Sequence, residues 1–362
     1  MPKIAIIADW LTNQGGAEKV IYDLHQCFPN APIYTSIYNQ KKLPQFKKAD
    51  IRTSFLNKFP FAKNKHQLYL ALMPYAFESF DLSQYDIVIS SSFACAKGVI
   101  TAPETTHICY CHNPMRYIWD ESHQYVKEHN FNPILKFMAK PFLHKLRIWD
   151  RITADRVDHF IANSKFVAER IKKYYQRKAT VIHPGIEFTQ ENPKILEKKE
   201  NFYLAAGRIK AFKRFDLVIK AFNESKLHLK IVGTGEDLER LKKLNTNPNT
   251  EFLGFISNNE LTRLYQNAKA FIFPQAEDFG ITPVEAQYFG CPVIAYAKGG
   301  ALETIINHKT GIFFKEQTVE DLNNTILELE NTLFDYQSIS NHAANFSSDN
   351  FKKKIKDFIE NI

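Results

Sequence analysis

The chain has 362 residues, of which 44% are hydrophobic and 24% are charged, and its formal net charge at pH 7 is +8. This composition excludes general disorder, and because the length exceeds that of one ordinary hydrophobic core we expect two folded domains. No apolar run reaches the roughly 20 residues that span a bilayer, and the N-terminus lacks the pattern of a secretory signal. We therefore expect a cytoplasmic protein.

Short apolar runs alternate with amphipathic, helix-period segments from one end of the chain to the other. Because these runs lack polar alternation, we expect strands that are buried on both faces, as in parallel sheets covered by helices. The first half predicts strands at 3–9, 85–92, 106–112, 159–164 and 180–185. The second half predicts strands at 202–208, 227–233, 251–256, 270–275 and 291–296. The expected fold class is α/β, with two doubly wound parallel sheets.

A polar, charged stretch at 186–201 interrupts this alternation and predicts a linker between the two domains. The N-terminal domain is then 1–185, and the C-terminal domain runs from 186 to 345. The last segment, 346–362, predicts an amphipathic helix that packs back on the protein. Its apolar face consists of Phe351, Ile355, Phe358 and Ile359.

Positive charge is concentrated in the first half of the chain. Residues 1–185 hold 25 basic and 15 acidic residues, a balance of +10, whereas residues 186–362 hold 22 and 24, a balance of −2. Segments 41–65 and 131–149 interleave Lys and Arg with Phe, Leu and Trp, which suits an anionic membrane surface, although solvated helices over a core would look similar. No nucleic-acid-binding motif accompanies the charge, so we expect no nucleic acid partner.

The cysteines raise the question of a metal site. Five cysteines are scattered through apolar stretches, and "CYCH" at 109–112 is the densest group of metal-ligand residue types. No second pair of ligands completes a tetrahedral set, so the alternative, that Cys109 and Cys111 share one face of a buried strand, is favoured. We expect reduced thiols and no metal.

Residues that directly follow strands are the candidates for ligand binding, because parallel α/β sheets bind ligands at the carboxyl ends of their strands. Gly15 and Gly16 lead from the first strand into a helix, where backbone can approach a ligand, although a tight turn would look the same. Neither this pair nor "GTGEDL" at 233–238 matches the dinucleotide fingerprint. Arg208 and Lys213 enter a helix after the strand at 202–208 and suit a diphosphate.

The stretch "EDFGITPVEA" at 277–286 holds two glutamates on either side of an expected helix start. Thr282 as N-cap, Pro283 as first helical residue and Glu285 three residues after the cap match a helix N-terminus. Glu277 then lies in the preceding loop. The two carboxylates share no helical face, and their spacing alone does not establish an acid/base pair.

Over nearly its whole length the chain resembles the retaining, GT-B-fold nucleotide-sugar glycosyltransferases of family four. The resemblance rests on the order of the segments "GGAEKV", "CHNPMRYIWD", "ANSKFVAERI", "VIHPGIE", "AAGRIKAFKRFDLVIKAF", "IVGTGED", "FLGFIS" and "FPQAEDFGITPVEAQYFGCPVIAYAKGGALETI". The last segment is the most specific, since it holds the family's signature of two glutamates separated by seven residues. The resemblance implies two Rossmann-like domains that face each other across a cleft, with an acceptor-binding first domain and a donor-binding second domain.

By this resemblance, Arg208 and Lys213 bind the donor diphosphate, Glu285 holds the ribose hydroxyls and Glu277 contacts the transferred sugar. His112 borders the reacting centre, although a hydrogen-bonded histidine at a strand end is an equally simple interpretation. Catalytic roles thus fall to His112, Glu277, Arg208 and Lys213. The remaining donor contacts come from Gly15, Gly16, Phe255, Ile256, Gly280, Ile281 and Thr282.

The family retains the anomeric configuration, commonly explained by attack on the face from which the diphosphate departs, and we expect neither a metal nor another cofactor. "DW" at 9–10 and "HNPMRYIWD" at 112–120 are most similar to bacterial transferases, often mannosyltransferases, of O-antigen and capsule synthesis. The expected donor is GDP-mannose, with a UDP-sugar as the alternative, and the expected acceptor is a lipid-linked saccharide. We expect a peripheral protein on the cytoplasmic face of the inner membrane. A non-catalytic nucleotide-sugar binding subunit is the competing interpretation.

Overall fold

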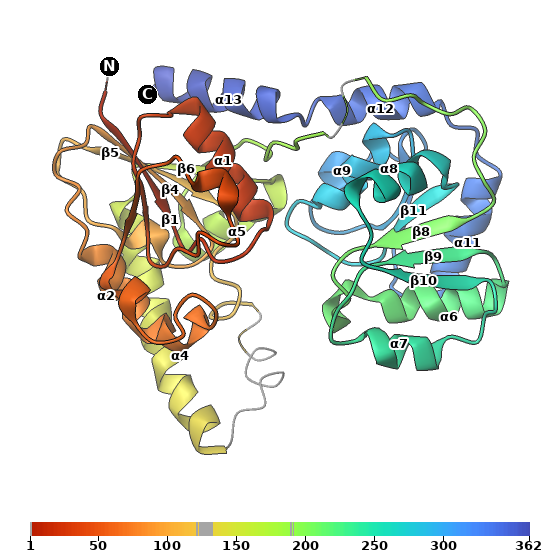
Figure 1. Ribbon diagram of the computed structural model, residues 1–362, viewed down its shortest axis with the longest axis horizontal. Helices are drawn as coiled ribbons and strands as arrows, with labels where there is room; N and C mark the ends of the chain where they lie inside the picture. The colour runs from red at the N-terminus through yellow and green to blue at the C-terminus, as the bar shows by residue number, and fades with distance from the viewer. Residues whose placement is uncertain (1, 121, 123–132, 189, 191) are drawn as a thin grey trace. The chain divides into compact units, whose positions relative to one another are not determined.

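The structure is a computed structural model that describes residues 2–120, 122, 133–188, 190 and 192–362, with only the backbone described for 133–140. The chain divides into two compact units (Figure 1). Unit 1 comprises Met1–Gly185 and Phe351–Ile362, and unit 2 comprises Ile186–Asn350. Both units are built around a parallel sheet, so the predicted α/β class is confirmed.

Unit 1 contains a seven-stranded sheet in the order β3-β2-β1-β4-β5-β6-β7, in which every paired strand is parallel to its neighbour. The strands are β1 (Ile4–Ala8), β2 (Ile33–Thr35), β3 (Ile51–Thr53), β4 (Ile87–Ser92), β5 (Thr106–Cys111), β6 (His159–Ala162) and β7 (Ala179–Val181). Its α-helices include α1 (Gly16–Cys27), α2 (Met73–Glu78), α4 (Pro133–Thr153), α5 (Lys165–Tyr175) and α13 (Ser348–Glu360). The order of the strands reverses between β1 and β4, which is where such sheets bind ligands.

Unit 2 contains a six-stranded parallel sheet in the order β10-β9-β8-β11-β12-β13, which reverses between β8 and β11. The strands are β8 (Tyr203–Ala206), β9 (Leu229–Val232), β10 (Thr250–Gly254), β11 (Ala270–Phe273), β12 (Val293–Tyr296) and β13 (Gly311–Phe314). The helices include α6 (Phe215–Ser225), α7 (Leu238–Leu244), α8 (Asn258–Asn267), α9 (Ile281–Tyr288), α10 (Ala301–Thr304), α11 (Val319–Glu330) and α12 (Tyr336–Ala344). This is the strand order of a dinucleotide-binding fold.

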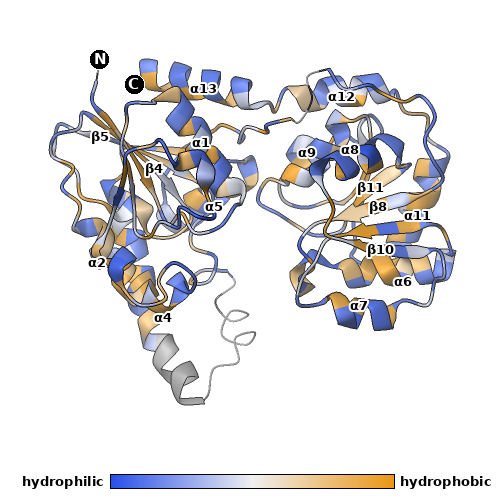
Figure 2. Cartoon of the chain, in the orientation of Figure 1, coloured by the Kyte–Doolittle hydropathy of each residue, from blue (hydrophilic) through white to orange (hydrophobic). Residues whose placement is uncertain are grey.

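Both sheets are buried on their two faces, as the continuous apolar runs predict. Along β1, Ala5 and Ile7 belong to one hydrophobic cluster, whereas Ile6 and Ala8 belong to another on the opposite face. Helices cover these faces with one apolar side each, and Figure 2 shows orange and blue segments alternating along α6 and α13. Burial on both faces explains why the strands lack the polar alternation of a half-exposed sheet.

All ten predicted strands are present, and the described residues contain three further strands that were missed. β2 and β3 have only three residues each, and β3 is an edge strand with one exposed side chain. β13 is also an edge strand, with the sequence GIFF. Runs this short show no period, so the sequence does not distinguish them from apolar loop residues.

The C-terminal helix α13 returns to unit 1, where Phe351 and Ile355 are buried beside α1 (Figure 1). The Phe351 ring meets the Tyr110 ring of β5 edge-on at 5.6 Å between centroids. Unit 2 therefore extends to Asn350, five residues beyond the predicted 345. The predicted linker packs on unit 2, since Phe188 stacks on Tyr288 at 3.6 Å.

The predicted interfacial segment 131–149 is described only in part. Residues 131–132 and the side chains of 133–140 lie outside the described residues. In the remainder of α4, Leu143 and Leu146 are buried in the core of unit 1, whereas Ile148 is 48% exposed. The described half of the segment thus packs one face on the protein, as a solvated helix over a core does.

Candidate functional site

The carboxyl ends of β8 and β11 bring the predicted donor residues of unit 2 to one edge of its sheet. The loop after β8 carries Arg208 and Lys213, and the loop after β11 carries Glu277 and Gly280. Since β8 and β11 are neighbouring parallel strands at the reversal of the strand order, these two loops start side by side.

Lys213 and Glu277 form an ion pair between the two loops. The Lys213 ammonium donates to Glu277 Oε1, and Gln275 Nε2 donates to the same oxygen at 3.0 Å. Their side chains are 17% and 23% exposed, so both groups are held by the protein yet reachable from outside. The sequence placed both residues at the site but did not predict that they pair, because spacing carries no information about which side chains meet.

Arg208 adds a second cation to the same edge. Its side chain is exposed, and it has no ion-pair partner in the described part of the chain. The neighbouring Arg214 is instead engaged with Asp216 at 3.3 Å and Gln317 at 2.8 Å. A guanidinium that no carboxylate neutralises suits a phosphate, which it can bind with two parallel hydrogen bonds.

Helix α9 begins two residues earlier than predicted, and the Thr282 cap is wrong. The N-cap is Gly280, which has φ +87° and no side chain, and Ile281 and Thr282 are the first two helical residues. Glycine enters this left-handed conformation without steric cost, so the chain turns into the helix there. Pro283 is then the third helical residue, where its missing N–H is one of the four that no intrahelical carbonyl accepts. Glu285 lies inside the helix and is half-buried.

Close backbone contacts hold these loops together, and glycines make them possible. A Cβ atom on Gly233 would lie 1.9 Å from the Gly207 carbonyl oxygen, and one on Gly299 would lie 2.2 Å from the Glu277 carbonyl oxygen. The Gly300 N–H donates to the same Glu277 carbonyl at 2.9 Å. From the sequence, "GTGEDL" at 233–238 was tested only against the dinucleotide fingerprint, and Gly207, Gly299 and Gly300 were assigned no role.

Phe255 and Ile256 follow β10 at the same edge of the sheet. The Phe255 ring is 88% exposed, whereas Ile256 is half-buried. Ser257 and Glu260 then form a capping box that starts α8. A fixed loop thus presents an exposed aromatic face, to which a flat nucleobase can stack.

In unit 1, His112 follows β5 and its Nε2 lies 2.8 Å from the Ser91 hydroxyl. Burial lowers the pKa of His112 to about 4, so its imidazole is neutral at pH 7. Gly15 is the N-cap of α1 with an extended backbone, and both Gly15 and Gly16 are exposed. Gly15, Gly16 and His112 thus follow strands at the carboxyl edge of the unit 1 sheet, and their contact with a ligand stays a prediction.

Two further polar residues at this edge escaped the sequence analysis. The Asp9 carboxylate accepts hydrogen bonds from the N–H groups of Phe93, Ala94 and Ala96 at 2.6–2.9 Å, and its burial raises its pKa to about 6. Asn113 is 5% exposed, and neither polar atom of its amide has a hydrogen-bond partner among the residues that the structure describes. Both residues belong to segments quoted for the family resemblance, "DW" at 9–10 and "HNPMRYIWD" at 112–120, but neither was assigned a role.

Comparisons with known proteins agree with this architecture. A profile described as Glycosyltransferase Family 4 matches residues 14–190, and one described as Glycosyl transferases group 1 matches residues 186–346. The chain belongs to glycosyltransferase family 4. Together the two matches divide this glycosyltransferase near the boundary between units 1 and 2.

Relatives and solved structures support the assignment of this glycosyltransferase. Alpha-1,3/1,6-mannosyltransferase ALG2 of Kluyveromyces lactis is 25% identical over 81% of this chain and 69% of its own length. The apo lipopolysaccharide outer core galactosyltransferase WaaB is 18% identical over 99% of each chain, with a TM-score of 0.69. HepE of Anabaena, solved with UDP-glucose, is 17% identical over the full length of both chains, with a TM-score of 0.69. At this identity the solved structures show the GT-B fold.

Within the described part of the glycosyltransferase, no group of three or more His, Cys, Asp or Glu side chains could hold a metal ion. Cys109 and Cys111 are buried in one hydrophobic cluster, as expected for one face of a strand, while His112 is engaged with Ser91. Over the same residues, no helix is both long and apolar enough to cross a membrane.

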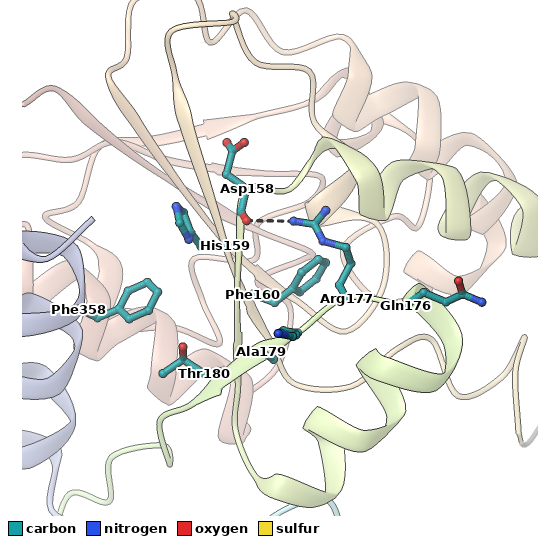
Figure 3. A pocket seen from close by; sticks show the side chains of 9 residues that line it. Asp158, His159, Phe160, Gln176, Arg177, Ala179, Thr180 and Phe358 are labelled. Atoms are coloured by element: carbon teal, nitrogen blue, oxygen red, sulfur yellow. Dashed lines mark hydrogen bonds between the residues drawn. The ribbon is translucent and has the colours of Figure 1, made fainter.

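A pocket of about 580 Å³ lies elsewhere in unit 1, at the amino ends of β6 and β7 (Figure 3). Its lining includes Asp158, Arg177 and Phe358 of α13. The Arg177 guanidinium donates to the carbonyl oxygens of Ala154 and Asp158 at 3.0 Å each, so its hydrogen bonds hold the fold. The pocket is at the opposite edge of the sheet from His112 and Asp9, and we assign it no role in glycosyl transfer.

Proposed function

We propose that the protein is a retaining glycosyltransferase that moves mannose from GDP-mannose to a lipid-linked saccharide in bacterial surface polysaccharide synthesis. The observation that carries the proposal is the edge formed by β8 and β11, with the Lys213–Glu277 pair, the unneutralised Arg208 and the start of α9. Two cations and the backbone N–H groups at a helix N-terminus suit a diphosphate, and the carboxylate paired with Lys213 suits sugar hydroxyls.

The chemistry follows from how charge develops in the reaction. The sugar C1–oxygen bond to the diphosphate breaks, an acceptor hydroxyl oxygen bonds to C1 on the same face, and its proton passes to a departing phosphate oxygen. Arg208 and Lys213 stabilise the negative charge on the leaving diphosphate, and the backbone of Gly280, Ile281 and Thr282 adds dipoles of the same sense. We propose that no metal is needed, so EDTA should leave turnover unchanged, and loss of activity restored by Mg²⁺ would contradict this.

We propose that the remaining donor contacts also come from the carboxyl edge of the unit 2 sheet. Glu285 binds the ribose hydroxyls from the first turns of α9, and Phe255 and Ile256 hold the base. A donor with guanine is favoured because ALG2 relatives are named mannosyltransferases. A UDP-sugar is the second candidate, since HepE was solved with UDP-glucose at a TM-score of 0.69.

Thermal unfolding in the presence of GDP, GDP-mannose, UDP and UDP-glucose tests the choice of donor. A ligand that binds only the folded protein at about 100 times its Kd stabilises it by about 2.7 kcal/mol. We expect GDP and GDP-mannose to raise the melting temperature. Stabilisation by UDP and UDP-glucose alone would reject mannose, and no stabilisation by any of the four would reject both proposed donors.

On the acceptor side, we propose that His112 in unit 1 contacts the acceptor hydroxyl as a neutral imidazole. Its Nε2 is paired with Ser91, which leaves Nδ1 for a ligand. With donor saturating, His112→Ala should lower turnover by roughly 100-fold, the size of a general acid–base contribution. Near-normal turnover would remove His112 from the mechanism. We also propose that the protein works on the cytoplasmic face of a membrane, where a lipid-linked acceptor is anchored.

A further inference from the structure

The exposed apolar side chains of the protein are concentrated in one segment of unit 1. Among the described residues, fifteen large hydrophobic side chains are exposed, and five of them lie between residues 59 and 75. They are Phe59 (37%), Phe61 (74%), Leu68 (66%), Leu72 (40%) and Tyr75 (65%). Single exposed apolar residues are common on soluble proteins, but a group of them on one short segment marks an interaction site. We call residues 55–75 the docking segment.

The two ends of the docking segment lie against each other. The Phe55 ring is 5.7 Å from the Phe59 ring and 5.6 Å from the Tyr75 ring between centroids. Phe59 also meets Tyr69 edge-on at 5.3 Å, and the Tyr69 hydroxyl donates to the Pro60 carbonyl at 2.6 Å. These contacts bring the first 3₁₀ helix (Phe55–Lys58), the second (His66–Leu72) and α2 together, so that the exposed Phe59 and Tyr75 both lie beside Phe55.

Phe61 stands at the tip of the turn between the two 3₁₀ helices. Its φ of +56° is in the left-handed region, which bulky residues rarely adopt. The N–H groups of Asn64 and Lys65 both donate to the Phe61 carbonyl, which holds this conformation. Phe61 is nevertheless 74% exposed, so the fold holds an aromatic residue in a strained conformation while most of its surface remains open to solvent.

The charge on the docking segment identifies the kind of partner. Lys58, Lys63 and Lys65 are exposed, and none has an ion-pair partner in the described part of the chain. The segment contains no Asp or Glu. Protein interfaces are depleted in lysine, whereas lysines around exposed aromatic rings are typical of segments that lie on anionic lipid.

The segment is also joined to the carboxyl edge of the unit 1 sheet. His66 is buried, its ring stacks on Trp10 at 4.5 Å, and its Nδ1 lies 3.3 Å from the Thr12 hydroxyl. Trp10 directly follows Asp9 at the end of β1. If the docking segment binds a surface, the carboxyl edge of the unit 1 sheet will therefore lie close to that surface.

We propose that the docking segment binds an anionic membrane surface, with Phe61 inserted at the level of the lipid head groups and the three lysines around it. The part of the inference that concerns a membrane-anchored acceptor rests on the function proposed above. The segment would keep the acceptor-side edge of unit 1 near the membrane.

Vesicle sedimentation of the full chain tests this proposal. We expect binding to vesicles of phosphatidylcholine with phosphatidylglycerol and little binding to phosphatidylcholine alone. Replacing Lys58, Lys63 and Lys65 by Ala should weaken binding by roughly 100-fold, at about fivefold for each lysine near the surface. The same replacement at Lys353, Lys354 and Lys356 of α13 removes equal charge and should have a smaller effect.

Phe61→Ser tests the apolar contact and should weaken binding by roughly tenfold. Leu333→Ser is the matched control, since Leu333 is 99% exposed in unit 2 and should not contribute. Unchanged thermal unfolding of each variant shows that the fold is kept. Absence of wild-type binding to the anionic vesicles, or equal effects of segment and control variants, would overturn the proposal. It would also be overturned if the wild type formed a dimer that Phe61→Ser converts to a monomer, because the segment would then be a contact between copies.

A transfer assay separates this inference from the proposed function. Phe61→Ser should lose transfer to an acceptor embedded in vesicles while it keeps transfer to a water-soluble acceptor. If no acceptor or donor supports transfer but the vesicle results hold, the proposed function fails and the docking segment stands. If transfer occurs equally from vesicles and solution in both proteins, the docking segment fails and the enzyme activity stands.

Discussion

Lys213 and Glu277 are the two residues on which the proposed donor chemistry depends most. Lys213→Met removes one cation from the edge where the diphosphate is proposed to leave, and it removes the ionic partner of Glu277. Loss of one preorganised donor to a developing charge lowers turnover by about 10²–10³-fold. We expect this loss in steady-state transfer assays. Lys220→Met, on the exposed face of α6, is the control and should keep wild-type rates; equal rates for both variants would contradict the assignment.

Asp9 makes the stability of unit 1 depend on pH. Burial raises its pKa from the ordinary 3.8 to about 6, so the folded protein holds this proton more tightly than the unfolded chain. The resulting stabilisation is fully present below about pH 4 and is lost as pH rises through 6. The shift corresponds to about 3 kcal/mol.

Denaturation followed by tryptophan fluorescence can measure this effect, because Trp10, Trp119 and Trp149 are the three tryptophans of the chain and all lie in unit 1. Relative to Asp9→Asn, the wild type should lose about 2 kcal/mol of unfolding free energy between pH 4 and pH 7, because part of the full effect is already lost at pH 4. Asp86→Asn, at an exposed carboxylate, should show no such difference. Wild-type and Asp9→Asn curves that run parallel across this range would show that Asp9 does not titrate there.

At the scale of elements, substitutions at the two ends of α9 distinguish an effect on stability from an effect on ligand binding. Gly280 at its start and Gly290 just after its end have φ of +87° and +71°, so Ala strains the backbone at either position by about 1–2 kcal/mol. Both variants should lower the melting temperature. Only Gly280→Ala should also weaken nucleotide affinity in calorimetry, because Gly280 lies beside the first backbone N–H groups of the helix. Equal affinities for the two variants would remove the α9 N-terminus from the donor site.

Long apolar runs made most of the strands predictable from the sequence. The short strands and the start of α9 were not predicted correctly, because they depend on local backbone conformation. The strands at the centres of both sheets are continuous apolar segments, but β2 and β3 are too short to show a period. Thr282 matched a helix cap by residue type. The N-cap is instead Gly280, two residues earlier, because glycine adopts the left-handed conformation there without steric cost. Propensity ranks residues one at a time, whereas the observed start depends on the conformation of the preceding loop.

The residues of the candidate site were also predictable only in part. Arg208, Lys213 and Glu277 were found because they follow strands, which is a rule about chain order. Asp9 and Asn113 follow the same rule but were missed, since their roles depend on burial and on which backbone groups they face. Sequence spacing carries neither quantity. The Lys213–Glu277 contact is a further example, as it joins residues 64 positions apart.

At the scale of the whole molecule, the chain ends in the unit where it began. Phe351 of α13 is 1% exposed and packs on Tyr110 in unit 1, so Phe351→Ala should destabilise that unit by about 3–5 kcal/mol. Tryptophan fluorescence should report this loss, while nucleotide binding by unit 2 should persist below the new transition. Lys354→Ala, exposed on the same helix, should leave the transition unchanged. An unchanged transition for Phe351→Ala would show that α13 does not stabilise unit 1.

The most direct test of the account is transfer itself. The purified protein is incubated with GDP-mannose or UDP-glucose and a lipid-diphosphate saccharide acceptor, and both the nucleoside diphosphate and the anomeric configuration of the new linkage are measured. We predict GDP release matched by an α-linked mannosyl product, with transfer nearly lost in Lys213→Met. A β-linked product, transfer that Lys213→Met leaves intact, or no transfer with any nucleotide sugar would contradict the account.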